Sequence, residues 1–212
     1  MNPVPRSRAL LALLVLAPLL AAAVPVAGWI QHRALVRKVR PVDGFHAGYF
    51  PNLTLTTQDG RRVRLYDDLL KGRTVLVNFF FIDCRDGVCP VTMTNLAKLQ
   101  RLLGDRCGRD IEFYSFELDP RADTPGRLAS YHRAIGAGPG WTFLTGSEHD
   151  LELCRRRFGF VDPDPAVDRA RSEHTSVVLM GNEPHERWMA SPAGSKPEWL
   201  LAQIERVAGS RL

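Results

Sequence analysis

Two cysteines, Cys84 and Cys89, lie where a strand is expected to end and a helix to begin. Residues 75–82 are mostly β-branched or aromatic, which predicts a buried strand, and residues 91–103 carry apolar side chains at helical spacing. Pro90 suits a first helical turn, because its missing N–H would have no helical partner there. The helix dipole and the free N–H groups of such a turn favour a thiolate over a thiol. A thiolate at Cys89 can attack a disulfide or bind a metal ion.

A long apolar run precedes these cysteines. Residues 9–30 carry no charged side chain and are numerous enough to cross a bilayer as one helix. Arg6 and Arg8 form a basic start, and the alanines at 21–23 fit a cleavage site, so a removed signal peptide is the alternative. We expect an uncleaved anchor, because the apolar run continues beyond those alanines. The more basic flank after the run opposes export under the positive-inside rule.

The chain divides into an anchor or signal segment at 1–30, a basic tether at 31–48 and one folded domain at 49–212. A length of 212 residues suits this division. The net charge is +5, yet six of the 28 Lys and Arg residues fall within 1–40, which has no Asp or Glu. The 22 that remain nearly balance 23 acidic residues. Nucleic acid is therefore excluded as the expected partner.

Strand and helix patterns alternate through the folded domain. Strands are expected at 53–57, 63–65, 75–82, 111–118, 141–144, 175–180 and 187–189, and helices at 91–103, 123–135, 147–158 and 197–207. Asp59-Gly60 predicts one hairpin turn and Gly181-Asn182 another, and a polar loop is expected from residue 162. This order predicts an α/β, thioredoxin-like fold: a mixed central sheet with helices on both faces, plus one N-terminal transmembrane helix.

The positions of the four cysteines indicate different chemistry. In an exported domain they meet an oxidising compartment, where disulfides persist. The short separation of Cys84 and Cys89 on one turn indicates a redox-active pair that is able to form a disulfide. Cys107 and Cys154 either form a second bridge or remain separate thiols, and the spacing leaves both alternatives open.

Several short motifs, taken in order, resemble the Sco/SenC family. They are Val-Asn-Phe-Phe at 77–80, Val-Cys-Pro-Val-Thr at 88–92, Leu-Asp-Pro at 118–120, Asp-Thr-Pro at 123–125, Trp-Thr-Phe-Leu-Thr-Gly at 141–146 and Glu-His-Thr-Ser at 173–176. Members of this family are thioredoxin-like copper-binding proteins that serve the assembly of cytochrome c oxidase. The resemblance covers most of residues 53–207.

In that family two cysteines of a Cys-x-x-x-Cys-Pro motif and a distant histidine bind copper. The resemblance therefore implies Cys84, Cys89 and His174 as the metal ligands. Residue chemistry agrees, because thiolates are soft ligands suited to Cu(I), and a neutral imidazole completes a three-coordinate site. A copper ion, with Cu(I) favoured, is the expected cofactor. A purely structural role is the alternative for a histidine just before a core strand.

The loop between the cysteines departs from the family motif, since four residues separate them here where the family has three. Gly87 lies in this longer loop, and glycine accepts backbone angles that other residues avoid, so the loop remains able to close. Asp119, at the end of a predicted strand, is a candidate partner behind the metal ligands. A turn or capping role before Pro120 is the equal alternative.

The function implied by the resemblance is that of a membrane-tethered copper chaperone. Such a protein delivers copper to a cytochrome c oxidase copper site or prepares the cysteines of that site. It is a metallochaperone, with thiol–disulfide oxidoreductase activity as an accompanying property. The implied partners are an apo copper-site protein such as a cytochrome c oxidase subunit, a thiol reductant, and the membrane through the N-terminal helix. The implied location is the cell inner membrane, single-pass, with the folded domain on the periplasmic side.

Other functions remain open. A thiol–disulfide oxidoreductase acting on a partner protein without bound metal would use the same strand–turn–helix placement of a cysteine pair. A copper sensor that does not deliver its metal is a third candidate. A thiol peroxidase fits less well, because Phe81 and Asp86 stand where the resembling peroxidase pattern has a threonine three residues before its reactive cysteine.

Overall fold

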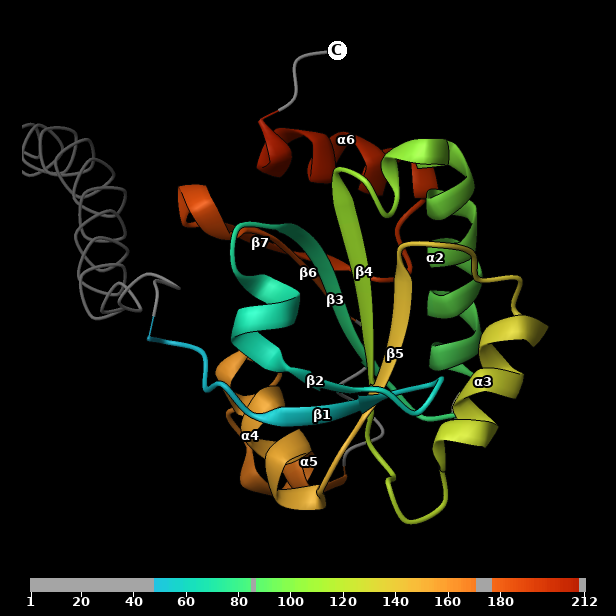
Figure 1. The fold of residues 1–212 in the computed structure, drawn as a ribbon, viewed down its shortest axis with the longest axis vertical. Coiled ribbons are helices and arrows are strands. Elements are labelled where there is room, and N and C mark those ends of the chain that lie inside the picture. Colours follow the sequence, from blue (N-terminus) through green and yellow to red (C-terminus); the bar gives the residue numbers. More distant parts are fainter. Residues whose placement is uncertain (1–47, 85–86, 171–176, 210–212) are drawn as a thin grey trace, which may run out of the picture. The chain divides into compact units, whose positions relative to one another are not determined.

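The computed structural model describes residues 48–84, 87–170 and 177–209. Its strands are β1 (Thr54–Thr57), β2 (Arg62–Arg64), β3 (Thr74–Phe80), β4 (Ile111–Glu117), β5 (Trp141–Thr145), β6 (Val177–Asn182) and β7 (Arg187–Pro192). They form one sheet in the order β2-β1-β5-β4-β3-β6-β7 (Figure 1). The central strands β3, β4 and β5 are parallel, and the flanking pairs are antiparallel. The sheet is therefore mixed, as the sequence predicts.

The helices and shorter helical turns occupy the connections between these strands. They are α2 (Val88–Leu103), α3 (Pro125–Ala134), α4 (Glu148–Arg157), α5 (Pro165–Ala170) and α6 (Pro197–Ala208), with the turns η1 (Leu65–Leu70), η2 (Gly104–Arg106) and η3 (Glu183–His185). Two of the helices begin at a side-chain cap. The Thr124 hydroxyl accepts a hydrogen bond from the Arg127 N–H, and the Ser147 hydroxyl accepts one from the Asp150 N–H. These caps fix where α3 and α4 begin, because they satisfy N–H groups that the helix leaves without a partner.

Strand β3 contributes side chains to two separate hydrophobic cores. Leu76 and Phe80 join the core formed with α2, α3 and α6. Val75, Val77 and Phe79 join the other core, formed with η1 and α4. Because successive side chains of a strand point to opposite faces, a strand that is apolar at both sets of positions needs cover on both faces. The helices on both faces of the sheet in Figure 1 provide that cover.

One edge of the sheet gathers the elements that carry the predicted site. Strands β3 and β4 are parallel, so both end there, and the chain then leads to Cys84 and to Asp119 respectively. Strand β6 is antiparallel to β3, with Leu179 opposite Val77, and it therefore begins at the edge where β3 ends. The carboxyl ends of parallel strands are the usual place for sites in open α/β sheets.

One expected helix begins earlier than expected, and one helix was not expected. The helix after the cysteines begins at Val88 rather than at residue 91, so Cys89 is its second residue. The polar segment from residue 162 does not continue as a loop, because α5 begins at Pro165. A buried ion pair holds this short helix: Arg155 Nη1 lies 2.8 Å from Asp168 Oδ1. Such a partner on another helix leaves no signal in the local sequence.

The expected turn at Gly181-Asn182 is also misplaced. Both residues lie inside β6, and η3 makes the turn that leads to β7. Gly181 pairs with Trp188 across the two strands, and a Cβ atom at Gly181 would lie 2.2 Å from the Trp188 ring. The glycine is therefore needed for close packing against the indole and does not mark a turn.

The predicted anchor, residues 1–30, and the tether up to residue 47 lie outside the described residues. No helix in the described ranges combines the length and the apolar character needed to span a bilayer. The anchor therefore stays a prediction from the sequence.

Candidate metal and thiol site

A hydrogen bond joins the two cysteines across the turn between β3 and α2. The backbone N–H of Cys89 donates a hydrogen bond to Sγ of Cys84, with an N to S distance of 3.3 Å. Cys89 is fully buried, whereas Cys84 is partly exposed. A donor from the first turn of a helix stabilises negative charge on a sulfur atom. The sequence placed this stabilisation at Cys89, and the structure directs it to Cys84, the partly exposed residue of the two.

Gly87 forms the last step of the loop before α2. It is the residue that precedes the helix, and its backbone is left-handed, with φ at 76°. Glycine adopts this conformation at little cost, whereas a side chain makes it strained. A Cβ atom there would meet no neighbour within 4 Å, so the requirement is conformational and not steric. The sequence-based expectation for Gly87 is confirmed in this respect, while residues 85–86 lie outside the described part of the chain.

His174, the third predicted ligand, lies outside the described residues, in the segment 171–176. The next described residue, Val177, opens β6 at the edge of the sheet where β3 ends. In the described ranges, no group of three or more His, Cys, Asp or Glu side chains is placed to hold a metal ion. The described part of the site is thus the cysteine pair alone.

Tyr131 borders the cysteines, a role that the sequence did not suggest beyond an apolar helix face. Its ring stacks on Phe80 with centroids 5.7 Å apart. Burial raises the pKa of Tyr131 to about 12, and the negative charges of Cys89 and then Cys84 add to the rise. The phenol therefore stays neutral at physiological pH and offers a hydroxyl group, without charge, next to the thiol pair.

Asp119 is exposed and its backbone N–H donates to the carboxyl group of Glu117, the last residue of β4. Glu117 is fully buried and hydrogen-bonded to the side chain of Asp123, which is also buried. Burial raises the pKa of Glu117 to about 9, with the nearby acidic groups Asp123 and Asp119 adding to the rise. A protonated Glu117 can donate to the Asp123 carboxylate, so two acids share one site without mutual repulsion.

The sequence did not single out Glu117. Its signal was a glutamate between two apolar residues, Phe116 and Leu118, near the end of the predicted strand 111–118. A charged side chain is almost never fully buried unless it is paired, so a glutamate at such a position was a clue to a polar cluster.

The other two cysteines cannot form a disulfide with each other. Cys107 belongs to the core with α2, α3 and α6, whereas Cys154 belongs to the core with η1 and α4 on the opposite face of the sheet. None of the four cysteines forms a disulfide within the described residues. Burial raises the pKa of the Cys154 thiol to about 12, so this thiol is unreactive. The alternative of separate thiols, left open by the sequence, is the one that the fold allows.

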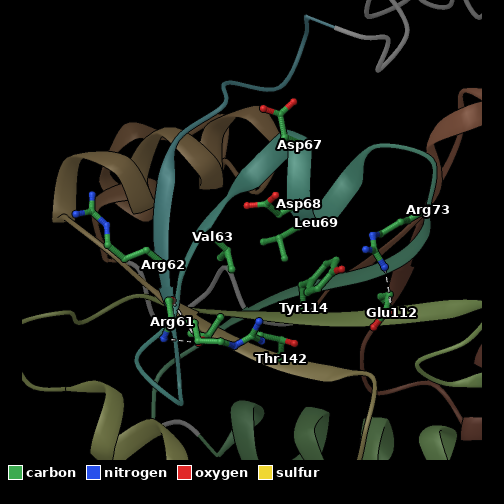
Figure 2. A pocket seen from close by; sticks show the side chains of 11 residues that line it. Arg61, Arg62, Val63, Asp67, Asp68, Leu69, Arg73, Glu112, Tyr114 and Thr142 are labelled. Carbon is green, nitrogen blue, oxygen red and sulfur yellow. Dashed lines mark hydrogen bonds and ion pairs between the residues drawn. The ribbon is translucent and has the colours of Figure 1, made fainter.

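A polar cavity of about 490 Å³ lies away from the cysteines, at the amino-terminal ends of β3, β4 and β5 (Figure 2). Arg73 and Glu112 form an ion pair of 3.2 Å on its wall, and Tyr114 and Thr142 also line it. Parallel strands place this cavity at the opposite end of the sheet from Cys84. The cavity is therefore separate from the thiol site.

A mixed sheet covered by helices, with a cysteine pair between a central strand and the following helix, defines the thioredoxin-like class. Within that class, the SCO1/SenC family profile matches residues 45–209. The match spans most of the chain, and the protein therefore belongs to the SCO1/SenC family.

Solved structures agree with this assignment at the level of the fold. Yeast Sco1 with copper bound superposes with a TM-score of 0.58 at 19% identity, covering 77% of this chain and 96% of Sco1. A SCO1/SenC family lipoprotein from Bacillus anthracis gives 0.60 at 23% identity, covering 80% and 98%. BsSco, described as a Sco-family cytochrome c oxidase assembly protein with a disulfide switch, gives 0.61 at 23% identity, with the same coverage of 80% and 98%.

A curated relative is also similar in sequence. This protein of Stutzerimonas stutzeri, named as a candidate copper-binding protein, is 29% identical over 133 residues. The matched region is 62% of this chain and 61% of the relative, so the chain spans less than two thirds of that protein's length.

Proposed function

We propose that this protein is a copper-binding chaperone of the Sco type, with Cys84, Cys89 and His174 as the copper ligands. The observation that carries the proposal is the cysteine turn. It places both cysteines at one helix start, with the Cys84 sulfur 3.3 Å from the Cys89 backbone nitrogen. Thiolates are soft ligands suited to Cu(I), and a single imidazole completes a three-coordinate set.

The chain's own residues provide the setting for the metal. Cys89 is buried, so one ligand is shielded from solvent, while the partly exposed Cys84 leaves a route for ligand exchange with an acceptor. Phe80 and the Tyr131 ring pack in the same core as both cysteines, and the Tyr131 hydroxyl stays uncharged. His174 precedes β6, whose described start lies at the same edge of the sheet as the end of β3. Asp119, exposed and bonded through its N–H to Glu117, acts in the proposal as an electrostatic partner near the site.

Delivery and location complete the proposal. The acceptor is an apo copper-site protein, such as a cytochrome c oxidase subunit, and a thiol reductant keeps the cysteines able to bind, since only thiolates are ligands. Residues 1–30 anchor the chain in the inner membrane by a single helix, with the folded domain on the periplasmic side. The copper-bound yeast Sco1 and the assembly role stated for BsSco support this reading by their shared fold.

A titration of the reduced, full-length protein in detergent with Cu(I) tests the proposal. We expect one Cu(I) per chain, with Cys84→Ser and His174→Ala each weakening binding at least tenfold, which is about 1.4 kcal/mol. His149→Ala is the matched control, because His149 is an exposed histidine on α4. No stoichiometric uptake by the wild type, or the same affinity for all the variants, would contradict the proposal.

The second candidate is a thiol–disulfide oxidoreductase that carries no metal. Its support is the asymmetry of the pair: Cys84 is partly exposed and its sulfur receives a helix N–H, while Cys89 is buried. This asymmetry suits an attacking and a resolving thiol. The variant His174→Ala distinguishes the two candidates, because it leaves dithiol exchange intact if metal plays no part in the function.

A further inference from the structure

Asp83, the residue before Cys84, forms an ion pair with a residue of α3. Arg127 of α3 places Nη2 2.7 Å from Oδ2 of Asp83. The other terminal nitrogen, Nη1, lies 2.6 Å from Oδ1 of Asp123. One guanidinium group thus bridges two carboxylates, and one of them belongs to the cysteine turn.

The two ends of this bridge differ in exposure. The Asp83 side chain is 76% exposed, whereas that of Asp123 is 2% exposed. Asp123 is held on several sides, because its carboxylate accepts hydrogen bonds from the Ile82 N–H and the Glu117 side chain. Its own backbone N–H donates to the Asp119 carbonyl at 2.9 Å. Arg127 therefore connects an exposed residue of the turn to a fixed buried anchor.

An isolated ion pair between exposed side chains contributes little to the position of a loop. The Arg127 bridge is different, because a planar guanidinium group holds two carboxylates in defined directions at once. Together with the Ile82 contact, it fixes two consecutive residues immediately before Cys84. On the Cys89 side of the turn, α2 itself holds the backbone.

We propose that Arg127 is a positioning residue for the thiol pair: by holding Asp83 against Asp123, it keeps Cys84 where its sulfur receives the Cys89 N–H. This positioning role rests on the proposed function in one respect: both require that Cys84 and Cys89 act as thiols. In that position the Cys84 sulfur accepts a backbone N–H. Such a hydrogen bond is stronger to a thiolate than to an uncharged disulfide sulfur, so the bridge favours the dithiol form, and its loss makes the disulfide harder to reduce.

The reaction that reports this effect needs no metal. The Cys84–Cys89 disulfide accepts two electrons and two protons from a dithiol such as dithiothreitol, which becomes a cyclic disulfide while the two protein thiols form. Equilibration of the full-length protein in mixtures of reduced and oxidised dithiothreitol gives the equilibrium constant. A tenfold change in that constant corresponds to about 30 mV for two electrons.

We expect Arg127→Gln to shift the equilibrium about tenfold toward the disulfide. Asp83→Asn should shift it in the same direction. The double variant should shift it no further than the larger single effect, because both changes break the same contact between Arg127 and Asp83. Asp83 is exposed, so Asp83→Asn tests the bridge even if Arg127→Gln does not fold. Arg121→Gln is the matched control, since Arg121 makes an exposed ion pair of 2.7 Å with Glu148 and no contact with Asp83.

Arg127→Lys separates charge from geometry. Lysine keeps the positive charge but cannot bridge two carboxylates in a fixed fork, so we expect most of the shift seen with glutamine. A wild-type equilibrium constant for Arg127→Lys would overturn the proposal, as would equal shifts for Arg127→Gln and Arg121→Gln, or additive effects of the two single changes.

These results are independent of copper. If the wild type binds no Cu(I) and the thiol equilibrium still shifts, the proposed copper function fails and the positioning role stands. If the wild type binds Cu(I) and the Arg127 and Asp83 effects are absent, the positioning role fails alone.

Discussion

The backbone N–H of Cys89 donates to the sulfur of Cys84, and this single contact makes the two cysteines unequal. Cys84 is partly exposed and receives a donor from the start of α2. Cys89 is fully buried in the core beneath that helix. Chemistry that begins with attack from solvent therefore begins at Cys84.

Alkylation should reveal this inequality. We expect iodoacetamide to modify Cys84 at least tenfold faster than Cys89 in the reduced native protein, because reaction needs an accessible sulfur. Peptide mass spectrometry at successive times measures both rates. Cys107 and Cys154 serve as internal controls, since both are buried and burial raises the pKa of each thiol. Equal rates at Cys84 and Cys89 would show that the turn does not distinguish them.

The buried Glu117 should make stability depend on pH. Its pKa rises from the ordinary value of 4.5 to about 9 on folding, so the folded state holds a proton that the unfolded state releases. Its contribution to stability is complete below pH 4.5 and is lost as the pH rises toward 9, by at most about 1.4 kcal/mol per pH unit. Glu117→Gln keeps a donor to Asp123 and has no proton to lose.

We therefore expect Glu117→Gln to match the wild type near pH 5 and to exceed its free energy of unfolding by at least about 1 kcal/mol at pH 8. Denaturant titrations at several pH values measure the difference. Glu148→Gln, at an exposed carboxylate in an ion pair with Arg121, is the control. A constant difference between Glu117→Gln and wild type over this range would contradict the assignment.

Gly87→Ala should destabilise the protein by about 1–2 kcal/mol, because alanine is strained at a left-handed backbone position. A Cβ atom at Gly87 meets no neighbour, so steric clash adds nothing. Gly194→Ala is the matched control, since Gly194 also has open space around it and its φ is not in the left-handed region. Chemical denaturation compares the two. A loss at Gly194 as large as that at Gly87 would argue against a backbone origin.

Gly181→Ala tests the close approach of β6 to the Trp188 ring. A Cβ atom would lie 2.2 Å from that ring, so the indole or the strand must move, at a cost of about 1–3 kcal/mol. Gly126→Ala in α3 is the contrasting variant, because its Cβ meets only the Thr124 hydroxyl at 4.0 Å. Alanine is the better helix former, so Gly126→Ala should preserve or raise the melting temperature. A melting temperature of Gly181→Ala equal to that of wild type would refute the packing explanation.

Local patterns were enough to predict the central strands, the starts of α3 and α4 and the turn that carries the cysteines. Each of these depends on contacts within a few residues: alternation of apolar side chains, a hydroxyl cap such as Ser147, or a thiol next to a helix start. Local patterns did not predict α5, and they misplaced the hairpin at Gly181. Asp168 of α5 is held by an ion pair with Arg155, and Gly181 is required by the close packing of Trp188, and both partners lie on other elements.

The sequence by itself determined which atoms can do chemistry here: two thiols on one turn, Cys84 and Cys89, in a domain whose basic and acidic side chains nearly balance. Tertiary structure alone decided which sulfur receives the helix N–H. It also decided that Asp123, hydrogen-bonded to the buried Glu117, forms the ion pair with Arg127. The reason is physical, because hydrogen bonds and burial join residues that are distant in the chain. Residue type sets what a group can do, and its surroundings set its charge and direction.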